Sequence, residues 1–302
     1  MTPWVTAVVL AWNGREDTLR CLRSLMGVTY PALSVVLVDN GSTDGGPDAV
    51  GAEFPDIRMI ELGENRGFAG GVNAGIAAAR RSGSDFVLLL NNDAVVEPGF
   101  LEPLVDSASS EGVAAACSQI LDAQGQHIWY AGASYDPRRG YQGRHTGYGD
   151  PPLPPTVGPY TTDRACGGAM LVPRSVLDVI GTLDEDLFAY AEDVDWSMRA
   201  RATGLEIVVV PASVVRHRVS GASGGAASPT SVYYALRNGI VVAERYAPRG
   251  RVATWARRAI AAGAAMLQAL GSADKVGGLR AVADGLVDGV RRQLGPRRGR
   301  SY

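Results

Sequence analysis

The sequence contains an apolar run that ends abruptly on side chains able to bind a cation. Residues 86–90 are entirely apolar, and Asn91, Asn92 and Asp93 follow directly. Hard divalent cations such as Mg²⁺ and Mn²⁺ prefer oxygen ligands, commonly one or two carboxylates together with substrate phosphates. Asp93 can supply such an oxygen, although the same residue types also begin ordinary turns. The motif is therefore a candidate cation site.

A second stretch, 191–196, offers three carboxylates: Glu192, Asp193 and Asp195. Transfer of a group onto a hydroxyl requires a base that accepts the hydroxyl proton, and a carboxylate can serve. If the stretch is helical, Asp193 and Asp195 point about 200° apart, whereas Glu192 and Asp195 share a face. The alternative interpretation is a solvated acidic helix start that the helix dipole favours.

Polar residues also follow two other β-rich runs. Asn13 comes after the first run, while Asp39 and Asn40 close the second, with Ser42 nearby. A carboxylate or amide at such a position can accept a hydrogen bond from a nucleotide base. The same residue types also cap helices, so both interpretations stay open.

A glycine-rich turn provides a further candidate for binding a ligand. Arg66 could reach a phosphate or a base, and Gly67 and Gly70 precede or begin an alanine-rich helix expected over 68–81. Glycine lets the backbone approach a ligand closely, and N–H groups at a helix start can face an anion. Simple helix-start chemistry is the alternative.

One histidine has neighbours that suit phosphate chemistry. His217 stands between Arg216 and Arg218, before a segment rich in glycine and serine. A single histidine is more often an ordinary surface residue. We assign no chemical role to His127 and His145.

The elements that must position these residues form an alternating pattern. Strands are expected over 5–12, 33–40, 58–65 and 85–93, with helices between them. The first, second and fourth lack polar alternation, which is typical of a parallel sheet buried on both faces. Ligands on such sheets bind at the carboxyl ends of the strands. The polar clusters after three of the strands therefore predict a single crevice.

Composition limits the possible classes of protein. The 302 residues carry a formal charge of −2, which gives no indication of nucleic-acid binding. The three cysteines are widely spaced and form no C-x-x-C pair, so we expect free thiols in a reducing compartment. The amino-terminal apolar stretch is short and lacks a preceding basic segment, which argues against a signal peptide. We therefore expect a cytoplasmic protein.

The carboxyl-terminal segment differs in charge from the rest. Residues 249–302 contain eleven Arg or Lys and three Asp, a net charge of +8. A helix is expected over 252–270, but its uninterrupted apolar part covers only 259–270, too short to span a bilayer. This helix could pack on the rest of the chain, form a homodimer, or contact anionic lipid as a peripheral anchor.

Seven motifs occur together in the order seen in family-2 glycosyltransferases. They are VVLAWNG, VVLVDNGSTDG, ENRGFAGGVNAGI, LLLNNDAVVEPGF, CGGAMLVPR, FAYAEDVDWSMRA and YYALRN. The chain thus resembles this family of inverting enzymes over roughly residues 4–245, in particular its bacterial rhamnosyltransferase-like branch. The resemblance implies an α/β GT-A fold with a mainly parallel, Rossmann-like sheet flanked by helices. It implies a domain over 1–248, with a nucleotide-sugar half (1–100) and an acceptor half (101–248), followed by a basic helical extension.

The resemblance also implies roles for individual residues. Asp193 becomes the better candidate for the base, with Glu192 as the alternative, and Asp93 and His217 become ligands of a divalent cation, Mg²⁺ or Mn²⁺. Asn91 replaces the first acid of a D-x-D-like motif, which makes cation binding weaker or more dependent on substrate. Residues expected to bind the donor are Asn13, Asp39, Asn40, Ser42, Arg66, Gly67, Gly70, Asn73, Asn91, Asn92 and Arg218. Residues expected on the acceptor side are Gly167, Gly168 and Trp196, with stacking faces from Tyr130, Tyr135, Tyr141, Tyr148 and Tyr160.

The implied donor is a pyrimidine nucleotide-sugar, first dTDP-L-rhamnose or a related deoxysugar and second a UDP-sugar. The acceptor could be a glycan, a lipid-linked glycan or a natural product. Two other enzyme classes fit less well, because a nucleotidyltransferase or a dehydrogenase needs a glycine-rich loop after the first strand, where this chain has Asn13-Gly14-Arg15. A non-catalytic nucleotide-sugar binding protein remains an alternative, although it would not need Asp193.

Overall fold

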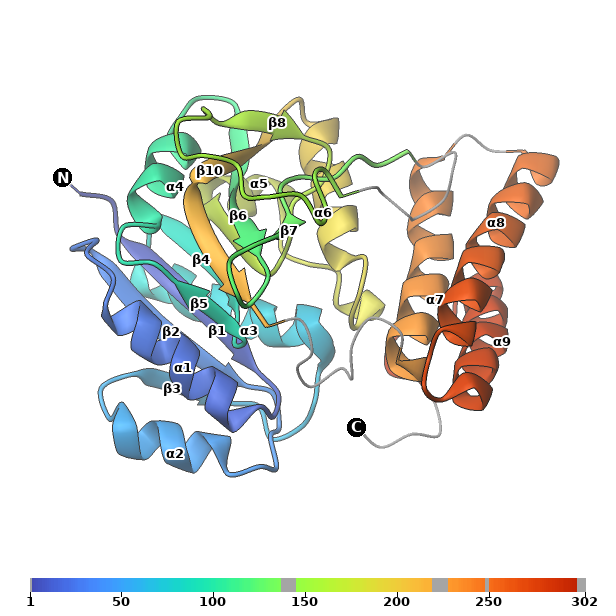
Figure 1. Ribbon diagram of the computed structural model, residues 1–302, viewed down its shortest axis with the longest axis horizontal. Helices are drawn as coiled ribbons and strands as arrows, with labels where there is room; N and C mark the ends of the chain where they lie inside the picture. Colours follow the sequence, from blue (N-terminus) through green and yellow to red (C-terminus); the bar gives the residue numbers. More distant parts are fainter. Residues whose placement is uncertain (1, 137–144, 219–227, 248–249, 298–302) are drawn as a thin grey trace.

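The computed structural model describes residues 2–136, 145–218, 228–247 and 250–297. The first part alternates strands and helices as expected (Figure 1). Its elements are β1 (Val5–Ala11), α1 (Arg15–Met26), β2 (Leu33–Asp39), α2 (Gly46–Glu53), β3 (Arg58–Glu61), α3 (Gly67–Ser82) and β4 (Phe86–Asn91).

The remaining elements add strands to the sheet and end in three long helices. They are β5 (Ala94–Val96), α4 (Leu101–Ala108), β6 (Val113–Leu121), β7 (Ile128–Tyr130), β8 (Tyr160–Thr162), β9 (Ala169–Pro173), α5 (Arg174–Ile180), a 3₁₀ turn (Glu185–Leu187), α6 (Glu192–Ala202), β10 (Glu206–His217), α7 (Pro229–Tyr246), α8 (Arg251–Leu270) and α9 (Lys275–Arg291).

One twisted sheet runs through the described chain in the order β3-β2-β1-β4-β9-β6-β10-β5. The first four of these strands are parallel, as the unalternating apolar runs predicted. β9 runs antiparallel to both of its neighbours, β4 and β6, so the sheet as a whole is mixed. This antiparallel strand lies between β4 and β6 and so joins the parallel strands to the rest of the sheet, although the chain reaches β6 first.

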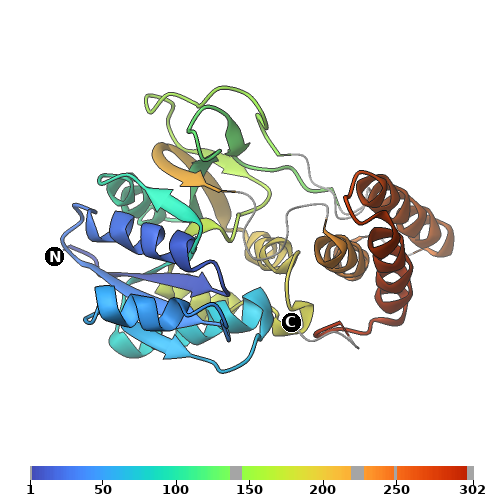
Figure 2. The ribbon, with the colours of Figure 1, turned by 60° about the horizontal axis from the view of Figure 1, so that its bottom comes forward.

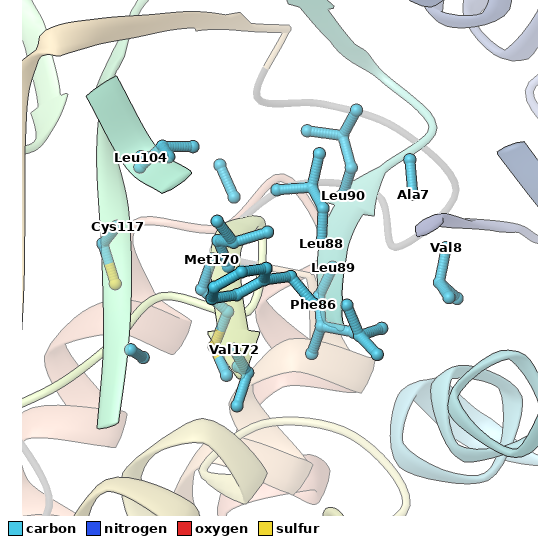
Figure 3. Packing of buried hydrophobic residues seen from close by; sticks show 14 of the residues in the cluster. Ala7, Val8, Phe86, Leu88, Leu89, Leu90, Leu104, Cys117, Met170 and Val172 are labelled. Carbon is cyan, nitrogen blue, oxygen red and sulfur yellow. The ribbon is translucent and has the colours of Figure 1, made fainter. Parts of the chain in front are cut away.

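The core lies where β4 and β9 cross the centre of the sheet. Figure 3 shows Leu88, Leu89 and Leu90 of β4 beside Met170 of β9, all of them buried, and the register pairs Leu89 with Met170. Burial of each such side chain stabilises the fold by about 1.5–3 kcal/mol. The central strands therefore provide a rigid support for the polar residues that follow them.

Helix α3 lies unusually close to the sheet because it presents glycines to β1. A Cβ atom added to Gly71 would lie 2.3 Å from a methyl carbon of Leu10, and one added to Gly75 would lie 2.1 Å from a methyl carbon of Val8. No larger residue fits at these positions without movement of the helix. The glycines thus fix the distance between α3 and β1.

The last three helices form a bundle beside the sheet (Figures 1 and 2). α9 packs closely on α7, since a Cβ at Gly285 would lie 2.9 Å from the carbonyl oxygen of Tyr233. The helix expected over 252–270 is confirmed as α8. The sequence led us to expect a domain boundary at residue 248, between α7 and α8. In the structure α7 shares an apolar cluster with α8 and α9. Within the described ranges, no helix has the length and apolarity needed to cross a membrane.

Candidate active site

The polar residues at the ends of β1 and β2 are held in one hydrogen-bonded cluster. The backbone N–H of Asn13 donates to the hydroxyl of Ser42 (2.8 Å), and the N–H of Thr43 donates to the side-chain oxygen of Asn13 (2.9 Å). The carboxylate of Asp39 accepts from the N–H groups of Gly41 and Ser42. A small pocket lies between these two strand ends, and Asn13, Asp39 and Ser42 line it.

The side chain of Asn40 holds the backbone of the neighbouring loop at Arg66 and Gly67. Its amide nitrogen donates to the carbonyl oxygen of Gly67 (3.0 Å), and its amide oxygen accepts from the N–H of Arg66 (2.9 Å). Asn40 is buried, whereas the Arg66 side chain is 53% exposed. The exposed guanidinium of Arg66 lies 3.7 Å from a carboxylate oxygen of Glu64, so a ligand would compete with this carboxylate, while Asn40 fixes the backbone that carries Arg66.

Three residues expected to bind the donor instead hold the protein together. The amide of Asn73 bonds Leu183 through both its nitrogen (2.9 Å) and its oxygen (3.1 Å). A Cβ at Gly67 would lie 2.3 Å from the carbonyl oxygen of Phe188, and one at Gly70 would lie 2.9 Å from the Cβ of Arg66. The structure assigns these residues packing roles, which the glycine-rich pattern did not distinguish from close approach to a ligand.

The two expected cation ligands meet in space although 123 residues separate them. One carboxylate oxygen of Asp93 lies 2.7 Å from Nε2 of His217, and both side chains are largely buried. Antiparallel pairing of β5 with β10 sets His217 opposite Ala94, the residue after Asp93. The ring of Trp129 packs against the imidazole, with ring centroids 5.1 Å apart.

The chemistry of this pair fits a cation such as Mn²⁺, since a carboxylate oxygen and an imidazole nitrogen are both common metal ligands. The amide nitrogen of Asn91 also lies 3.2 Å from Nε2 of His217. Nε2 would need a proton to bond Asp93 and a lone pair to accept from Asn91, and it cannot have both. The described residues contain no group of three or more His, Cys, Asp or Glu positioned to hold a metal. Further ligands would therefore come from substrate phosphates.

Asn92 and Arg218 lie on either side of this pair. The amide nitrogen of Asn92 donates to the hydroxyl of Thr18 (2.8 Å) and to the backbone of Asn13, so Asn92 ties the end of β4 to the end of β1. The backbone N–H of Arg218 donates to the carbonyl oxygen of Asp93 (3.2 Å), and its guanidinium is 55% exposed. The Arg218 guanidinium also donates to the carboxylate of Asp17 (3.1 Å), so an anionic ligand would compete with Asp17 for it, whereas the Asn92 amide is held by Thr18 and Asn13.

The three acids of the second stretch have separate environments at the start of α6. Asp195 is 2% exposed and is bonded by Arg199 (3.0 Å) and Arg245 (2.8 Å), so it is structural. Glu192 is also buried, and burial, together with the charge of Asp193, raises its pKa to about 8. Asp193 is only partly buried. Glu192 and Asp195 therefore lie on the buried face of α6, as the helical spacing predicted, and Asp193 lies on a different, partly exposed face.

Two adjacent glycines connect Asp193 with the cation pair. A Cβ at Gly167 would lie 3.1 Å from the ring of Phe68 and 3.9 Å from the Cβ of Asp193. A Cβ at Gly168 would lie 3.3 Å from the amide nitrogen of Asn91. The absence of side chains at both positions therefore lets Phe68 and Asn91 pack closely against this backbone, which places Asp193 and the end of β4 near each other.

Several expected acceptor contacts are not available on the surface. Trp196 is fully buried, and its indole N–H donates to the carbonyl oxygen of Gly181 (3.0 Å), so it belongs to the core. Tyr130 and Tyr135 are also buried, whereas Tyr148 is 67% exposed. Tyr141 lies outside the described residues.

Sequence reasoning gave no role to His145, which lies beside the site. The guanidinium of Arg164 donates to its Nε2 (2.8 Å), and its Nδ1 lies 2.9 Å from the carbonyl oxygen of Trp129. Burial lowers the pKa of His145. A neutral imidazole with its proton on Nδ1 satisfies both contacts. No sequence signal pointed to this pair, because both residues lie outside the recognised motifs.

Comparison with known proteins identifies the class of enzyme. The family model described as glycosyl transferase family 2 matches residues 6–181. The chain therefore belongs to this family of glycosyltransferases, and the rhamnosyltransferase-like resemblance is confirmed by relatives. N-acetylglucosaminyl-diphospho-decaprenol L-rhamnosyltransferase of Mycobacterium tuberculosis is 30% identical over 243 residues, 74% of this chain and 79% of the relative. dTDP-rhamnosyl transferase RfbF of Shigella flexneri is 22% identical over 245 residues, 79% of each chain.

Solved structures confirm the GT-A fold. GalNAc-T7 with UDP, GalNAc and Mn²⁺ matches with a TM-score of 0.61 and 18% identity, covering 80% of this chain and 48% of that one. The chain therefore spans about half the length of GalNAc-T7. Mannosyltransferase PcManGT from Pyrobaculum calidifontis, in complex with GDP-Man and Mn²⁺, matches with a TM-score of 0.58 and 18% identity, over 96% of this chain and 76% of that one.

Proposed function

We propose that this glycosyltransferase moves a deoxyhexose such as L-rhamnose from a pyrimidine nucleotide-diphosphate donor to an acceptor hydroxyl, with inversion at the anomeric carbon. The observation that carries the proposal is the arrangement around Gly167 and Gly168. A Cβ placed on Gly167 would lie 3.9 Å from the Cβ of the partly exposed Asp193, and one placed on Gly168 would lie 3.3 Å from the amide nitrogen of Asn91, at the end of β4 that leads to the Asp93–His217 pair. Single displacement needs a base and a leaving-group site on opposite sides of the sugar.

The chain's own residues would divide the reaction between them. Asp193 would accept the proton of the acceptor hydroxyl as its oxygen bonds to the anomeric carbon and the bond to the diphosphate breaks. Asp93 and His217 would hold a divalent cation, which, when bound, would neutralise charge on the departing diphosphate. Arg66 and Arg218, both exposed at this edge of the sheet, would contact phosphate oxygens.

The pocket between β1 and β2 would bind the base of the donor. Asp39 already accepts two backbone N–H bonds, but a carboxylate has about four acceptor positions. Capacity therefore remains for the N3–H of thymine or uracil. The Shigella relative is named as a dTDP-rhamnosyl transferase, which favours thymine over uracil as the base of the donor.

A panel of nucleotide sugars tests the donor assignment. We expect dTDP-L-rhamnose to give the largest thermal shift and the fastest release of nucleoside diphosphate, followed by UDP-sugars, with GDP-mannose as the control. The N3–H of a pyrimidine base is a donor that the Asp39 carboxylate can accept. Equal responses to all the donors would contradict the assignment.

We further propose that the acceptor is lipid-linked and that the protein acts in the cytoplasm, at the inner face of the membrane. Helix α8 exposes a continuous apolar face, including Val252 (85% exposed), Ile260 (57%) and Leu267 (74%). Helix α8 contains no acidic residue, and the segment from 249 onward has a net charge of +8. Apolar side chains combined with positive charge suit an anionic lipid surface. The Mycobacterium relative is named for a decaprenol-linked acceptor, which favours a lipid-linked acceptor here over a soluble glycan or a natural product.

Flotation with vesicles tests the membrane contact. The full chain should float with phosphatidylglycerol vesicles at low salt and much less at high salt, because screening weakens the attraction of the basic segment. Replacement of Ile260 and Leu267 by serine should abolish flotation. Val179→Ser, at an equally exposed apolar position on α5, should leave it unchanged. If wild-type protein never floats and its mass doubles with concentration, α8 is instead a homodimer contact.

A further inference from the structure

The segment that leads into Asp193 has an unusual backbone. Phe188, Tyr190 and Ala191 have φ angles of 65°, 67° and 71°, in the left-handed region that residues other than glycine seldom adopt. At Phe188, ψ is −64°, and the N–H of Ala189 donates to the carbonyl oxygen of Leu187 (2.8 Å). This geometry is a γ-turn of the rare, strained type. Such a backbone persists only when its surroundings hold it.

One side chain of the bundle holds most of this segment. The amide nitrogen of Asn238, on α7, lies 2.8 Å from the carbonyl oxygen of Leu187, 2.7 Å from that of Ala189 and 2.7 Å from that of Tyr190. Asn238 is fully buried. A single amide thus gathers three carbonyl oxygens that a relaxed chain would point in different directions.

Arg237, the preceding residue, fixes the orientation of this amide. Its Nε donates to the side-chain oxygen of Asn238 (2.8 Å), so the Asn238 amide nitrogen must face the segment. A terminal nitrogen of Arg237 also donates to the carbonyl oxygen of Leu187 (2.9 Å). Arg237 is itself fully buried, and its guanidinium lies 4.8 Å from the ring centroid of Tyr234. The pair therefore forms a rigid clamp.

The other contacts of the segment extend this clamp to the donor side of the cleft. The ring of Phe188 stacks on Tyr234 of α7, with centroids 5.2 Å apart. The carbonyl oxygen of Phe188 accepts from the N–H of Ala69 at the start of α3. The carbonyl oxygen of Ala191 accepts the first hydrogen bond of α6, from Asp195. The segment thus connects α7, α3 and α6 within a few residues.

We propose that Asn238, oriented by Arg237, is a positioning residue that holds Phe188, Tyr190 and Ala191 at their positive φ angles and thereby aims Asp193 at the acceptor. The clamp acts through the backbone and touches no substrate. Through Asn238 and Arg237 on α7, the helical bundle would thus contribute to the reaction as well as to any contact with a membrane. The inference rests on the proposed role of Asp193 as the base.

Kinetics of Asn238→Ala test the clamp. We expect kcat to fall about 10²-fold, because a displacement of about 1 Å in a reacting group can cost that much. The donor KM should change less than twofold, since the cation pair and the β1–β2 pocket are untouched. Hydrogen exchange of residues 187–193 should accelerate in the variant. The matched control is Tyr233→Phe on the same helix, which removes a bond to Asp288 (2.6 Å) inside the bundle and leaves the segment alone.

Rescue separates positioning from a general loss of stability. Ala191→Gly permits the left-handed conformation without steric cost, so adding it to Asn238→Ala should recover kcat several-fold, while alone it should change little. Asn238→Ser, which keeps one donor, replaces the alanine variant if that chain does not fold. The clamp is refuted if Asn238→Ala and Tyr233→Phe, compared at equal thermal stability, lose the same amount of kcat. It is also refuted if hydrogen exchange of residues 187–193 is unchanged in Asn238→Ala. Hydrogen exchange does not depend on which acid is the base, so failure of the Asp193 assignment would be visible separately.

Discussion

Replacement of Asp193 by asparagine should lower kcat for sugar transfer by about 10²–10⁴-fold, the usual contribution of a positioned general base. Asparagine has nearly the same shape but cannot accept the acceptor's proton. The donor should bind almost as tightly as to the wild-type enzyme, since the residues proposed to bind the diphosphate and the base are untouched. Single-turnover kinetics with saturating donor, together with donor titration by calorimetry, measure the two quantities separately.

Glu192→Gln is the matched control for this substitution. Burial and the charge of Asp193 raise the pKa of Glu192 to about 8, so at pH 7 its carboxyl group is mainly protonated and is a poor base. Glutamine should therefore keep transfer within a few-fold of wild type at that pH. A carboxyl group with a raised folded-state pKa contributes stability below its unfolded pKa and loses it as pH rises. Wild-type stability relative to Glu192→Gln should thus fall between about pH 4.5 and 8.

The opposite pattern would transfer the role of base to the neighbouring residue. If Asp193→Asn kept near-normal turnover and Glu192→Gln lost it, Glu192 would be the base. The acceptor would then have to approach a side chain that is 6% exposed in this structure.

The sequence was informative where local pattern and position in the sheet coincide. Apolar runs without alternation predicted β1, β2 and β4. The rule that ligands bind at strand ends predicted a crevice, and a small pocket lies at Asn13 and Asp39. The helical angle between Asp193 and Asp195 predicted different surroundings for the two acids, and Asp195 is buried whereas Asp193 is partly exposed. These conclusions need only the periodicity of a strand or a helix.

Other features depend on tertiary contacts that no local pattern contains. Gly67 and Gly70 show the same glycine-rich pattern whether they face a ligand or, as here, Phe188 and Arg66. Asn73 is a polar residue near the site whose partners lie more than 100 residues away. Trp196 directly follows the acidic stretch but is buried within the core. In each case the partner, rather than the residue type, determines the role.

The second large effect is expected at the Asp93–His217 pair. Asp93→Ala should weaken binding of the nucleotide-sugar and the dependence of that binding on Mn²⁺. We expect kcat/KM to fall at least about 100-fold, because mutation of residues that only support a metal ligand already lowers metal affinity or activity about 10–100-fold. Mn²⁺ binding in the presence of nucleoside diphosphate, followed by calorimetry or paramagnetic resonance, gives a readout independent of turnover. His217→Ala should act in the same direction, because its Nε2 lies 2.7 Å from the same carboxylate oxygen.

Asp122→Asn provides a control of the same chemical type. Asp122 pairs with His127 at 2.9 Å, in the turn between β6 and β7, where the histidine is 55% exposed. If removal of an Asp–His pair merely destabilised the fold, both substitutions would have comparable effects. We expect the Asp122 variant to bind Mn²⁺ and donor normally, because that pair is not at the carboxyl end of β4. Normal Mn²⁺ dependence in Asp93→Ala would show that this carboxylate holds no cation and that the Mn²⁺ is bound by other groups.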